Sequence, residues 1–250
     1  MQTSIYEMAK QMDKPKILII NSCSKSKATS HRDQPTCVDL TTKEGRENQK
    51  SKFKNILTPA GQLYTGKQAS SIQSAVNIFK EKHEVDYYII SAGFGFVNET
   101  EQLPPYECSF SGLGKRKIRE MSENLSIVKD MHKSITGKYD LIYLALGIDY
   151  LSAVGNLDFL ASKTSLLVHY NKHISEKEPY FLVNDYHIVT SISKLPEKIF
   201  EKPIGALIAS KGTLLENYAI SLQENNITIK DKPFNTWLEP KMNKINLVAT

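Results

Sequence analysis

The sequence predicts an α/β fold with a mainly parallel central sheet flanked by helices. Short apolar runs alternate with amphipathic stretches along the chain, as strands and helices alternate in folds of this class. The runs are almost continuously apolar, which is typical of strands that are covered on both faces. Four of the runs also end in a small or polar cluster, which marks the point where each strand stops.

Five strands are expected from these runs. The clearest are 16–22 (KILIINS), 85–93 (VDYYIISAG), 139–147 (YDLIYLALG) and 204–210 (IGALIAS). The fifth, 181–190 (FLVNDYHIVT), is more polar and is therefore expected nearer an edge of the sheet.

Three helices are expected, over 66–84, 115–135 and 211–226. Each repeats apolar residues at the three- and four-residue spacing of one helix face. The apolar stripes are Ile72, Ala75, Val76 and Phe79 in the first helix, Ile118, Met121, Leu125, Val128 and Met131 in the second, and Leu214, Tyr218 and Leu222 in the third.

A single α/β domain over 1–250 is expected, because folds of this class often form one unit at this length. The stretch 41–57 interrupts the pattern. Its first fifteen residues, TTKEGRENQKSKFKN, include five basic and two acidic side chains. We expect a mobile surface insertion here, whose function, if it has one, is contact with a phosphate backbone.

The composition is that of a soluble globular protein, with 40% hydrophobic residues and a net charge of +5. No apolar run approaches the ~20 residues that span a membrane, and the first sixteen residues lack the apolar segment of a secretory signal. A cytoplasmic protein without a membrane partner is expected. The mild basicity fits a polyanionic partner, but a lysine-rich surface without such a role fits equally well. Nothing in the sequence specifies an oligomeric state.

The three cysteines, Cys23, Cys37 and Cys108, are an odd number and form no CxxC pair. They are therefore expected to be reduced thiols. Together with His31 they contain the donors of a zinc site, but their irregular spacing argues against one, so neither a metal nor another cofactor is expected.

Ligands of open α/β sheets bind beyond the carboxyl ends of the strands. The clusters NSCSKSK, SAGFGF, LGIDY and ASKGT follow four predicted strands and are expected to converge on one crevice. Lysines and backbone N–H groups in the first cluster suit a phosphate, although a plain solvated loop is the alternative. The residues predicted to bind substrate are Asn21, Ser22, Cys23, Lys25, Lys27, Tyr64, Gly66, Ser91, Gly93, Gly95, Tyr106, Tyr150 and Lys211.

The stretch 91–112 (SAGFGFVNETEQLPPYECSFSG) concentrates special residues in one loop. Gly93 and Gly95 permit unusual torsions or close approach of a ligand, and two adjacent prolines hold Tyr106 and Glu107 in a fixed direction. An aromatic ring beside a carboxylate suits stacking on a base and hydrogen bonding to its edge. The alternative is a structural turn with Tyr106 in the core, and Tyr64 has the same two interpretations.

Two carboxylates are candidates for catalysis, Asp149 and Glu107. Asp149 follows a strand, where it can act as a general base or stabilise a cationic transition state, but it can equally be a helix N-cap. Lys211 stands at a helix start, a position that favours an anion. A Cys23 nucleophile with a histidine base is a further possibility.

Taken together, these motifs resemble a known group. SCSKSK, LYTGKQA and SAGFGFV…LPPYE resemble bacterial domains related to the peroxide-stress DNA-binding protein family, and SKGTLLENYAI is similar to its late lysine–glycine helix. SCSKSKATSH and LPPYE…FSG also resemble the amidotransferase-like domain of archaeosine synthase, a tRNA-modifying enzyme whose domain is grouped by fold with uracil-DNA glycosylases.

The resemblance extends over 16–225 and implies a uracil-DNA-glycosylase-like α/β fold and a nucleic-acid partner, DNA above all. The Gly-Gln-Asp-Pro-Tyr motif with which the glycosylase activates water is missing, so no catalytic residue is carried over. The other domains of archaeosine synthase are also missing, which makes a tRNA substrate less expected.

The leading expectation is a DNA glycosylase-like enzyme that flips and excises a modified or damaged base, in repair or in defence against modified phage DNA. Tyr64 and Tyr106 would stack on the base, Asn21 and Glu107 would read its edges, Asp149 or Glu107 would assist the chemistry, and Lys25, Lys27 and Lys211 would hold phosphates. The alternatives are a non-catalytic DNA-binding protein of stress protection and a tRNA base-modifying transferase.

Overall fold

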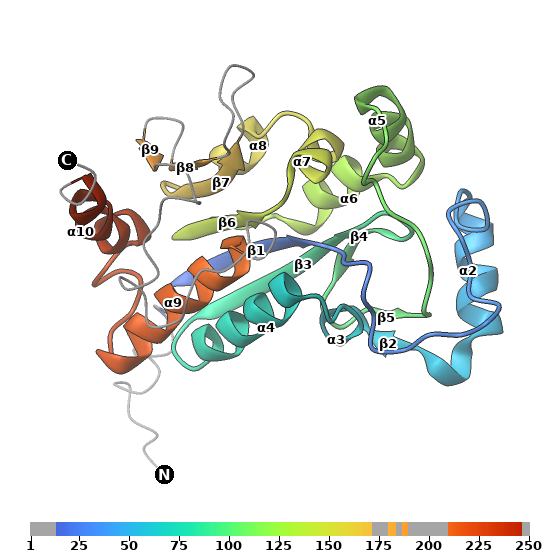
Figure 1. The fold of residues 1–250 in the computed structure, drawn as a ribbon, viewed down its shortest axis with the longest axis horizontal. Coiled ribbons are helices and arrows are strands. Elements are labelled where there is room, and N and C mark those ends of the chain that lie inside the picture. The colour runs from blue at the N-terminus through green and yellow to red at the C-terminus, as the bar shows by residue number, and fades with distance from the viewer. Residues whose placement is uncertain (1–13, 172–179, 184–186, 190–209, 247–250) are drawn as a thin grey trace, which may run out of the picture.

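The computed structural model describes residues 14–171, 180–183, 187–189 and 210–246 (Figure 1). Their main sheet has seven strands in the order β4-β3-β1-β6-β7-β8-β9. The strands are β1 (Lys16–Ser22), β3 (Glu84–Ser91), β4 (Gly95–Asn98), β6 (Leu141–Ala145), β7 (Leu167–Asn171), β8 (Tyr180–Val183) and β9 (His187–Val189). A separate two-stranded ribbon pairs β2 (Thr58–Pro59) with β5 (Gln102–Leu103).

The centre of the sheet is parallel, which confirms the predicted α/β class. Strands β3, β1, β6 and β7 pair in parallel, while β4 at one edge and β8 and β9 at the other are antiparallel. The segment Ile17–Ile20 of β1 is completely buried, as expected for a strand with neighbours on both sides and helices on both faces.

Helices cover both faces of the sheet (Figure 1). The pair α4 and α9 lies side by side along one face, while α5, α6 and α7 lie beyond the other. The helices are α2 (Lys43–Lys52), α3 (Ala60–Leu63), α4 (Lys67–Lys80), α5 (Lys115–Asn124), α6 (Ile127–Ser134), α7 (Ile148–Val154), α8 (Asp158–Ala161), α9 (Ser210–Glu224) and α10 (Phe234–Asn246), with the 3-10 turn η1 (Lys54–Ile56).

Two of the predicted apolar stripes are confirmed by burial. In α4 the buried residues include Ile72, Val76 and Phe79, and in α9 the predicted Leu214 and Tyr218 are buried. Helix α9 differs in being buried around most of its circumference, polar residues included. It is therefore a core helix and not an amphipathic surface helix.

The helix predicted over 115–135 is two helices, α5 and α6. Ser126 between them has a φ of 54°, in the left-handed region, and a helix cannot continue through such a residue. Gly95 lies against this break, because a Cβ at position 95 would lie only 2.7 Å from the carbonyl oxygen of Leu125. Gly95 also has a φ of 83°, so both its torsion and its surroundings require glycine.

The prediction of a mobile loop over 41–57 was wrong, since most of this stretch is helical. Helix α2 has no buried residue, so the core does not hold it. Contacts at its two ends hold the helix in place. The Thr42 hydroxyl accepts a hydrogen bond from the Gly45 N–H, and Lys50 in the last turn lies 2.9 Å from Glu101.

The strand predicted over 85–93 ends at Ser91, and the chain then turns directly into the antiparallel strand β4, which was not predicted. The polar segment predicted as an edge strand contributes β8 and β9, which do form that edge. Of the strand predicted over 204–210, residues 204–209 lie outside the described residues, and Ser210 begins α9.

Cys37 and Cys108 form a disulfide, so the expectation of three reduced thiols was wrong. The two segments are already side by side, because Thr36 pairs with Glu107 as a β-bridge and the Glu107 N–H donates to the Pro35 carbonyl at 2.8 Å. Only long-range pairing brings the two sulfur atoms together.

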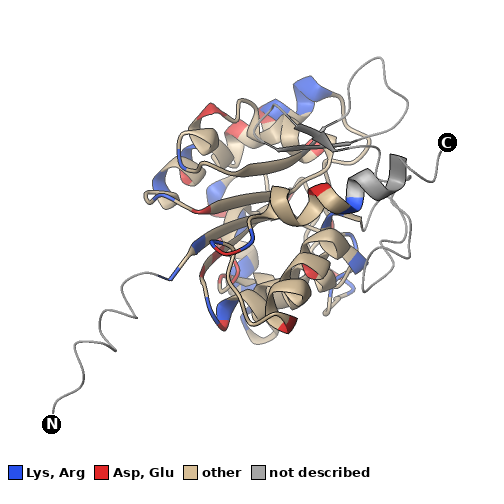
Figure 2. Cartoon of the chain, turned by 90° about the vertical axis from the view of Figure 1, so that its left-hand side faces the viewer, with Lys and Arg blue, Asp and Glu red and all other residues tan. Residues whose placement is uncertain are grey.

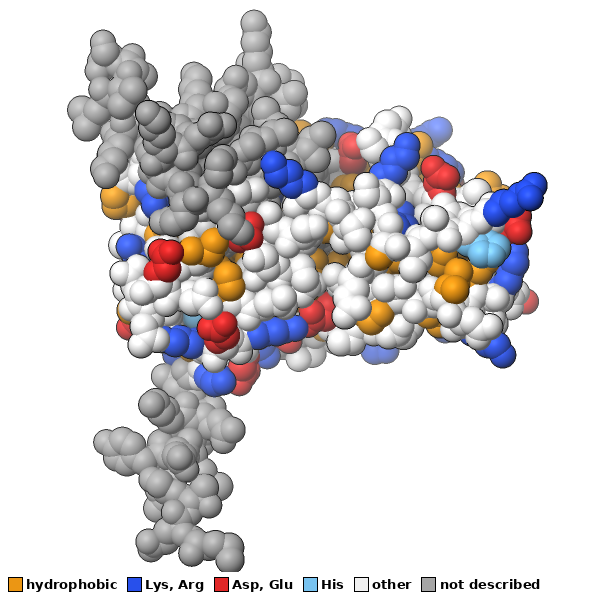
Figure 3. Space-filling view, turned by 60° about the horizontal axis from the view of Figure 1, so that its bottom comes forward, with side chains coloured by type: hydrophobic (Ala, Val, Ile, Leu, Met, Phe, Trp, Pro, Cys, Tyr) orange, Lys and Arg blue, Asp and Glu red, His pale blue; other side chains and the backbone are white. Residues whose placement is uncertain are grey.

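The surface is of mixed charge. Figures 2 and 3 show Lys and Arg interspersed with Asp and Glu on the faces in view, so neither face carries a single sign of charge. Among the described residues, no helix has both the length and the apolar character needed to cross a membrane.

Candidate functional site

The carboxyl ends of β1, β3 and β6 meet at one edge of the sheet, as predicted. Asn21 lies in register with Ile89 of β3 and with Ala145 of β6. The amide nitrogen of Gln68, in the first turn of α4, donates to Asn21 Oδ1 and to the Ala145 carbonyl, each at 2.8 Å. Gln68 therefore ties β1 to β6 at this edge.

Asn21 is used entirely within the protein. Its side-chain oxygen accepts from Gln68 and from the Ser22 N–H, and its nitrogen donates to the Tyr87 hydroxyl at 3.3 Å. Only 1% of Asn21 is exposed. The predicted base-reading amide is thus a buried cross-link. Its partner Gln68 was not among the predicted site residues, and its one signal in the sequence was its place at the start of a helix.

A chain of three hydroxyl groups lies behind this edge. The Tyr106 hydroxyl is 2.8 Å from both the Tyr64 hydroxyl and Ser91 Oγ. Ser91 Oγ in turn accepts from the N–H groups of Gly93 and Phe94, at 3.2 and 2.9 Å. Burial raises the pKa of both tyrosines well above the ordinary value, so both hydroxyls stay protonated and serve as hydrogen-bonding groups.

Tyr64 and Tyr106 are only 4% and 1% exposed, so the structure places both predicted stacking rings in the core. Phe94 packs edge-on against Tyr106, with ring centres 5.2 Å apart. Gly93 makes this packing possible, because a Cβ there would lie 2.6 Å from Leu40 Cδ1 and 3.0 Å from the Tyr106 ring. The two glycines of the loop thus make room for protein atoms.

Lys27 covers the Tyr106 ring. Its Nζ lies 4.2 Å from the ring centre and 6.0 Å from that of Tyr64, which is the geometry of a cation–π contact. Burial lowers the pKa of Lys27, while the nearby Cys23 and Glu107 act in the opposite direction. The partly buried ammonium group is therefore held against the Tyr106 ring, and it donates to the carbonyls of Ser24 and Lys25 at 3.3 and 3.5 Å.

The loop after β1 is ordered by backbone pairing. The N–H groups of Ala28 and Thr65 donate to the carbonyls of Leu63 and Ser26, at 2.8 and 3.1 Å. Gly66 permits this approach, because a Cβ there would lie 2.9 Å from Ser24 Cβ. The loop is therefore a built element and not a freely solvated segment, and it presents Lys25 on its exposed side.

Cys23 is buried and its Sγ lies 3.1 Å from the Tyr150 hydroxyl. Tyr150 packs against Phe110, with ring centres 5.2 Å apart. The contact that the structure gives this thiol is thus with a phenol, whereas a Cys23 nucleophile would need a histidine base.

The two candidate carboxylates differ in position. Glu107 is exposed and lies beside the cavity described next, whereas Asp149 is half-buried in the first turn of α7. The N-cap of α7 is Gly147, so the interpretation of Asp149 as an N-cap was wrong. A carboxylate in the first turn is nonetheless favourable, because it faces the positive end of the helix dipole.

A cavity of about 560 Å³ opens beside Lys27. Its walls come from the loop after β1 and from residues 106–111, and the disulfide between Cys37 and Cys108 forms part of them. The lining includes Lys25, Lys27, Glu107, Ser109 and Ser111, and Tyr106 borders it. Its volume lies within the range of small-molecule sites, and its lining offers cations, an anion and hydroxyls.

Lys211 does not line this cavity. It is 6% exposed in the first turn of α9, and burial lowers its pKa to about 8. Its carbonyl accepts a 2.8 Å hydrogen bond from the Tyr143 hydroxyl. The next residue, Gly212, lies against α4, since a Cβ there would be 2.6 Å from the Gln68 carbonyl oxygen. Lys211 thus belongs to the helix contact behind the crevice.

The structure therefore gathers the predicted residues into two groups. Lys25, Lys27, Tyr106 and Glu107 surround the cavity, whereas Asn21, Tyr64, Ser91 and the glycines support it from the core. Asp149, Lys211 and the pair of Cys23 and Tyr150 are in neither group. Within the described parts of the chain, no three His, Cys, Asp or Glu side chains are grouped as a metal site would require.

These features define an α/β protein with a polar, charge-lined cavity at the carboxyl edge of a parallel sheet. No protein-family model matches the chain, and a comparison with curated proteins finds no match either.

Proposed function

We propose that this chain is a DNA glycosylase-like enzyme, which takes a modified or damaged base out of DNA and excises it in the cavity between Lys27 and Glu107. The observation that carries the proposal is this cavity, which places two ammonium groups, a carboxylate, three serine hydroxyls and a threonine hydroxyl around a space of about 560 Å³. Such a set of donors and acceptors suits the polar edge of a base together with an adjacent phosphate.

In the proposed reaction, the bond between the base and C1′ of its sugar breaks, and a water molecule adds to C1′. Glu107 accepts a proton from that water or stabilises the positive charge that develops on the sugar. The base leaves with the bonding electrons and takes up a proton, so the products are a free base and an abasic site. Glu107 is the first candidate for this role because it alone of the two predicted carboxylates lines the cavity.

Lys27 has a different part in this proposal from the one expected. The contact with Tyr106 fixes the ammonium group at the cavity wall, where it can bind an anionic or carbonyl oxygen of the substrate. Tyr64 and Tyr106 then act through Lys27, as supports, and do not stack on the base themselves. Asp149 is retained as a second candidate carboxylate, because α7 begins where β6 ends.

The resemblance of the four strand-end motifs to uracil-DNA-glycosylase-like domains supports the same proposal. We therefore also propose that the chain has a fold of that group and forms a single domain. We propose that its partner is DNA and that it acts in the cytoplasm, in repair or in defence against modified phage DNA. The parallel sheet with its polar carboxyl edge is compatible with such a fold.

The test is incubation of the purified chain with DNA that carries damaged or modified bases, followed by alkaline cleavage and mass spectrometry of the released material. We expect a free base and alkali-labile sites, both lost in Glu107→Gln. Glu123→Gln is the matched control, because Glu123 is an exposed carboxylate on α5 outside the cavity lining.

Two other results would replace the proposal. DNA that is bound but unchanged across damaged and phage-type bases would make the chain a non-catalytic binding protein. Base exchange on tRNA without any action on DNA would make it a base-modifying transferase.

A further inference from the structure

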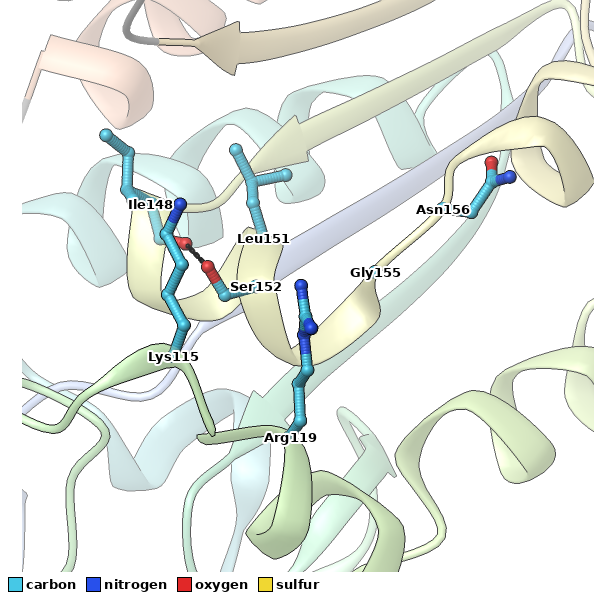
Figure 4. A pocket seen from close by; sticks show the side chains of 7 residues that line it. All are labelled: Lys115, Arg119, Ile148, Leu151, Ser152, Gly155 and Asn156. Carbon is cyan, nitrogen blue, oxygen red and sulfur yellow. Dashed lines mark hydrogen bonds between the residues drawn. The ribbon is translucent and has the colours of Figure 1, made fainter. Parts of the chain in front are cut away.

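A second cavity, of about 530 Å³, lies between α5 and α7 (Figure 4). Lys115 and Arg119 of α5 form one side, and Figure 4 shows both side chains extended toward α7. Ser152 of α7, with Gly155 and Asn156 just beyond its end, forms the other side. None of these residues was predicted to have a function.

The geometry points to a binding site for phosphates of a DNA strand in this groove, next to the nucleotide whose base enters the cavity at Lys27. The identity of the ligand as DNA rests on the proposed function.

The groove carries positive charge that the described residues do not neutralise. Helix α5 begins with KRKIR and has no acidic residue in its first turn. Of these cations, Lys117 pairs with Glu120 at 3.1 Å, but neither Lys115 nor Arg119 has an ion pair in the described part of the chain. Cations at a helix N-terminus face the positive end of the helix dipole, which is unfavourable. A bound anion removes this repulsion.

A buried hydrogen bond joins the two helices that form the groove. The buried Ser122 hydroxyl donates to the Ala153 carbonyl at 2.6 Å and so joins α5 to α7, and Ile118 of α5 is completely buried. The rim is open, because no atom lies within 4 Å of where a Cβ at Gly155 would be. A ligand can therefore enter without separating the two helices.

A short stretch of chain links the groove to the cavity. Ser111 of the cavity lining and Lys115 of the groove are four residues apart in sequence, so their Cα atoms lie within ~14 Å of each other. Phe110, just before Ser111, packs on Tyr150 of α7, with ring centres 5.2 Å apart, and so ties this stretch of chain to the helix that forms one side of the groove. One continuous strand can thus place a base in the cavity and its phosphates in the groove.

The form of the groove favours a polymer backbone over a small anion. Lys115 and Arg119 are one helical turn apart along an open rim and do not surround a single point. Ile148 and Leu151 of α7 add apolar surface to the lining, which suits the sugars of a strand. Contacts of this kind hold any sequence, because they reach only phosphate and sugar.

The experiment measures binding of the full chain to a fluorescein-labelled DNA oligonucleotide, as duplex and as single strand, by fluorescence anisotropy across a salt series. The test variant is Lys115→Ala/Arg119→Ala. Its matched control is Arg116→Ala/Lys117→Ala, which removes the same two charges from the same helix but leaves the groove lining intact.

Loss of two phosphate contacts should reduce the slope of log K against log salt by about 1.8 for duplex DNA and about 1.4 for the single strand. If the variant and the unchanged protein bind duplex DNA equally at 1 M salt, this difference in slope makes the affinity of the variant ~60-fold lower at 0.1 M salt. The control variant should change the slope by less than half as much. Because all four side chains are exposed, both variants should keep the melting temperature of the unchanged protein.

Equal slopes for the test and control variants would overturn the inference while leaving the glycosylase proposal standing. A reduced slope without release of any base would leave the groove standing and overturn the glycosylase proposal. Absence of DNA binding by the unchanged protein, or tighter binding of an RNA of the same sequence, would overturn the assignment of the groove to DNA.

Discussion

The side-chain nitrogen of Lys27 lies 4.2 Å from the centre of the Tyr106 ring, and this contact joins the loop after β1 to the segment that follows β5. The Tyr106 hydroxyl continues the connection to Ser91 at the end of β3. One lysine on the cavity wall is thus fixed by a network that reaches the centre of the sheet.

Tyr106→Phe should lower the free energy of unfolding by about 1–3 kcal/mol, because it leaves the buried hydroxyls of Tyr64 and Ser91 without the partner that they share. Urea denaturation measures this change. Tyr88→Phe is the control, since Tyr88 stacks on Phe96 and its hydroxyl makes no hydrogen bond within the described residues. Equal effects of the two substitutions would show that the hydroxyl chain contributes nothing specific.

Gln68→Glu should destabilise the protein by about 1–3 kcal/mol near neutral pH. It replaces a donor by a carboxylate oxygen that would face two acceptors, Asn21 Oδ1 and the Ala145 carbonyl. Gln62→Glu, at an exposed glutamine of α3, is the comparison. The measurement is the melting temperature of each variant. An equal decrease for both would contradict the role of Gln68 as a link between β1 and β6.

The stability of the protein should rise with pH between the folded pKa of Lys211, about 8, and pH ~10. In this range the unfolded Lys211, with its ordinary pKa of 10.5, binds a proton that the folded, buried Lys211 does not. Two pH units correspond to about 2–3 kcal/mol. Above pH ~10 the buried tyrosines, whose folded pKa values are raised, act in the opposite direction.

The measurement is urea denaturation at several pH values, for the unchanged protein and for Lys211→Met. The variant should lose most of the rise between pH ~8 and ~10. If it keeps the full rise, Lys211 is not the group responsible.

Removal of the bond between Cys37 and Cys108 should lower the free energy of unfolding by about 2–4 kcal/mol, because it frees a loop of 71 residues in the unfolded chain. Cys37→Ser/Cys108→Ser and the unchanged protein in reductant should unfold at the same urea concentration. Reductant should have no effect on the double variant. If neither the double substitution nor the reductant changes the urea concentration at the midpoint of unfolding, the disulfide does not stabilise the protein.

The parts of the fold that the sequence predicted correctly are those set by local apolar pattern. The strand at Ile17–Ile20 and the buried stripe of α4 follow from hydrophobic periodicity alone. Helix α2 could not be found in this way, because it has no buried face and depends on Thr42 and on an ion pair to Glu101, 51 residues from its Lys50.

The candidate site was predicted only in part. Of the four strand-end clusters that were expected to converge, only NSCSKSK contributes side chains to the cavity, and Glu107 comes from the loop that contains the two prolines. Whether a tyrosine lines a pocket or lies in the core depends on contacts between distant segments. Tyr64 and Tyr106 are 42 residues apart and bury each other, which no local pattern reveals.

The pairing of Cys37 with Cys108 also determines what happens when the chain is cut. Helix α2 is exposed, lysine-rich and lies between the two cysteines, so trypsin can cleave there. The two fragments stay joined through the sulfur atoms and appear at full mass until a reductant is added. Electrophoresis with and without reductant therefore reports, from one digested sample, whether these two segments meet in solution.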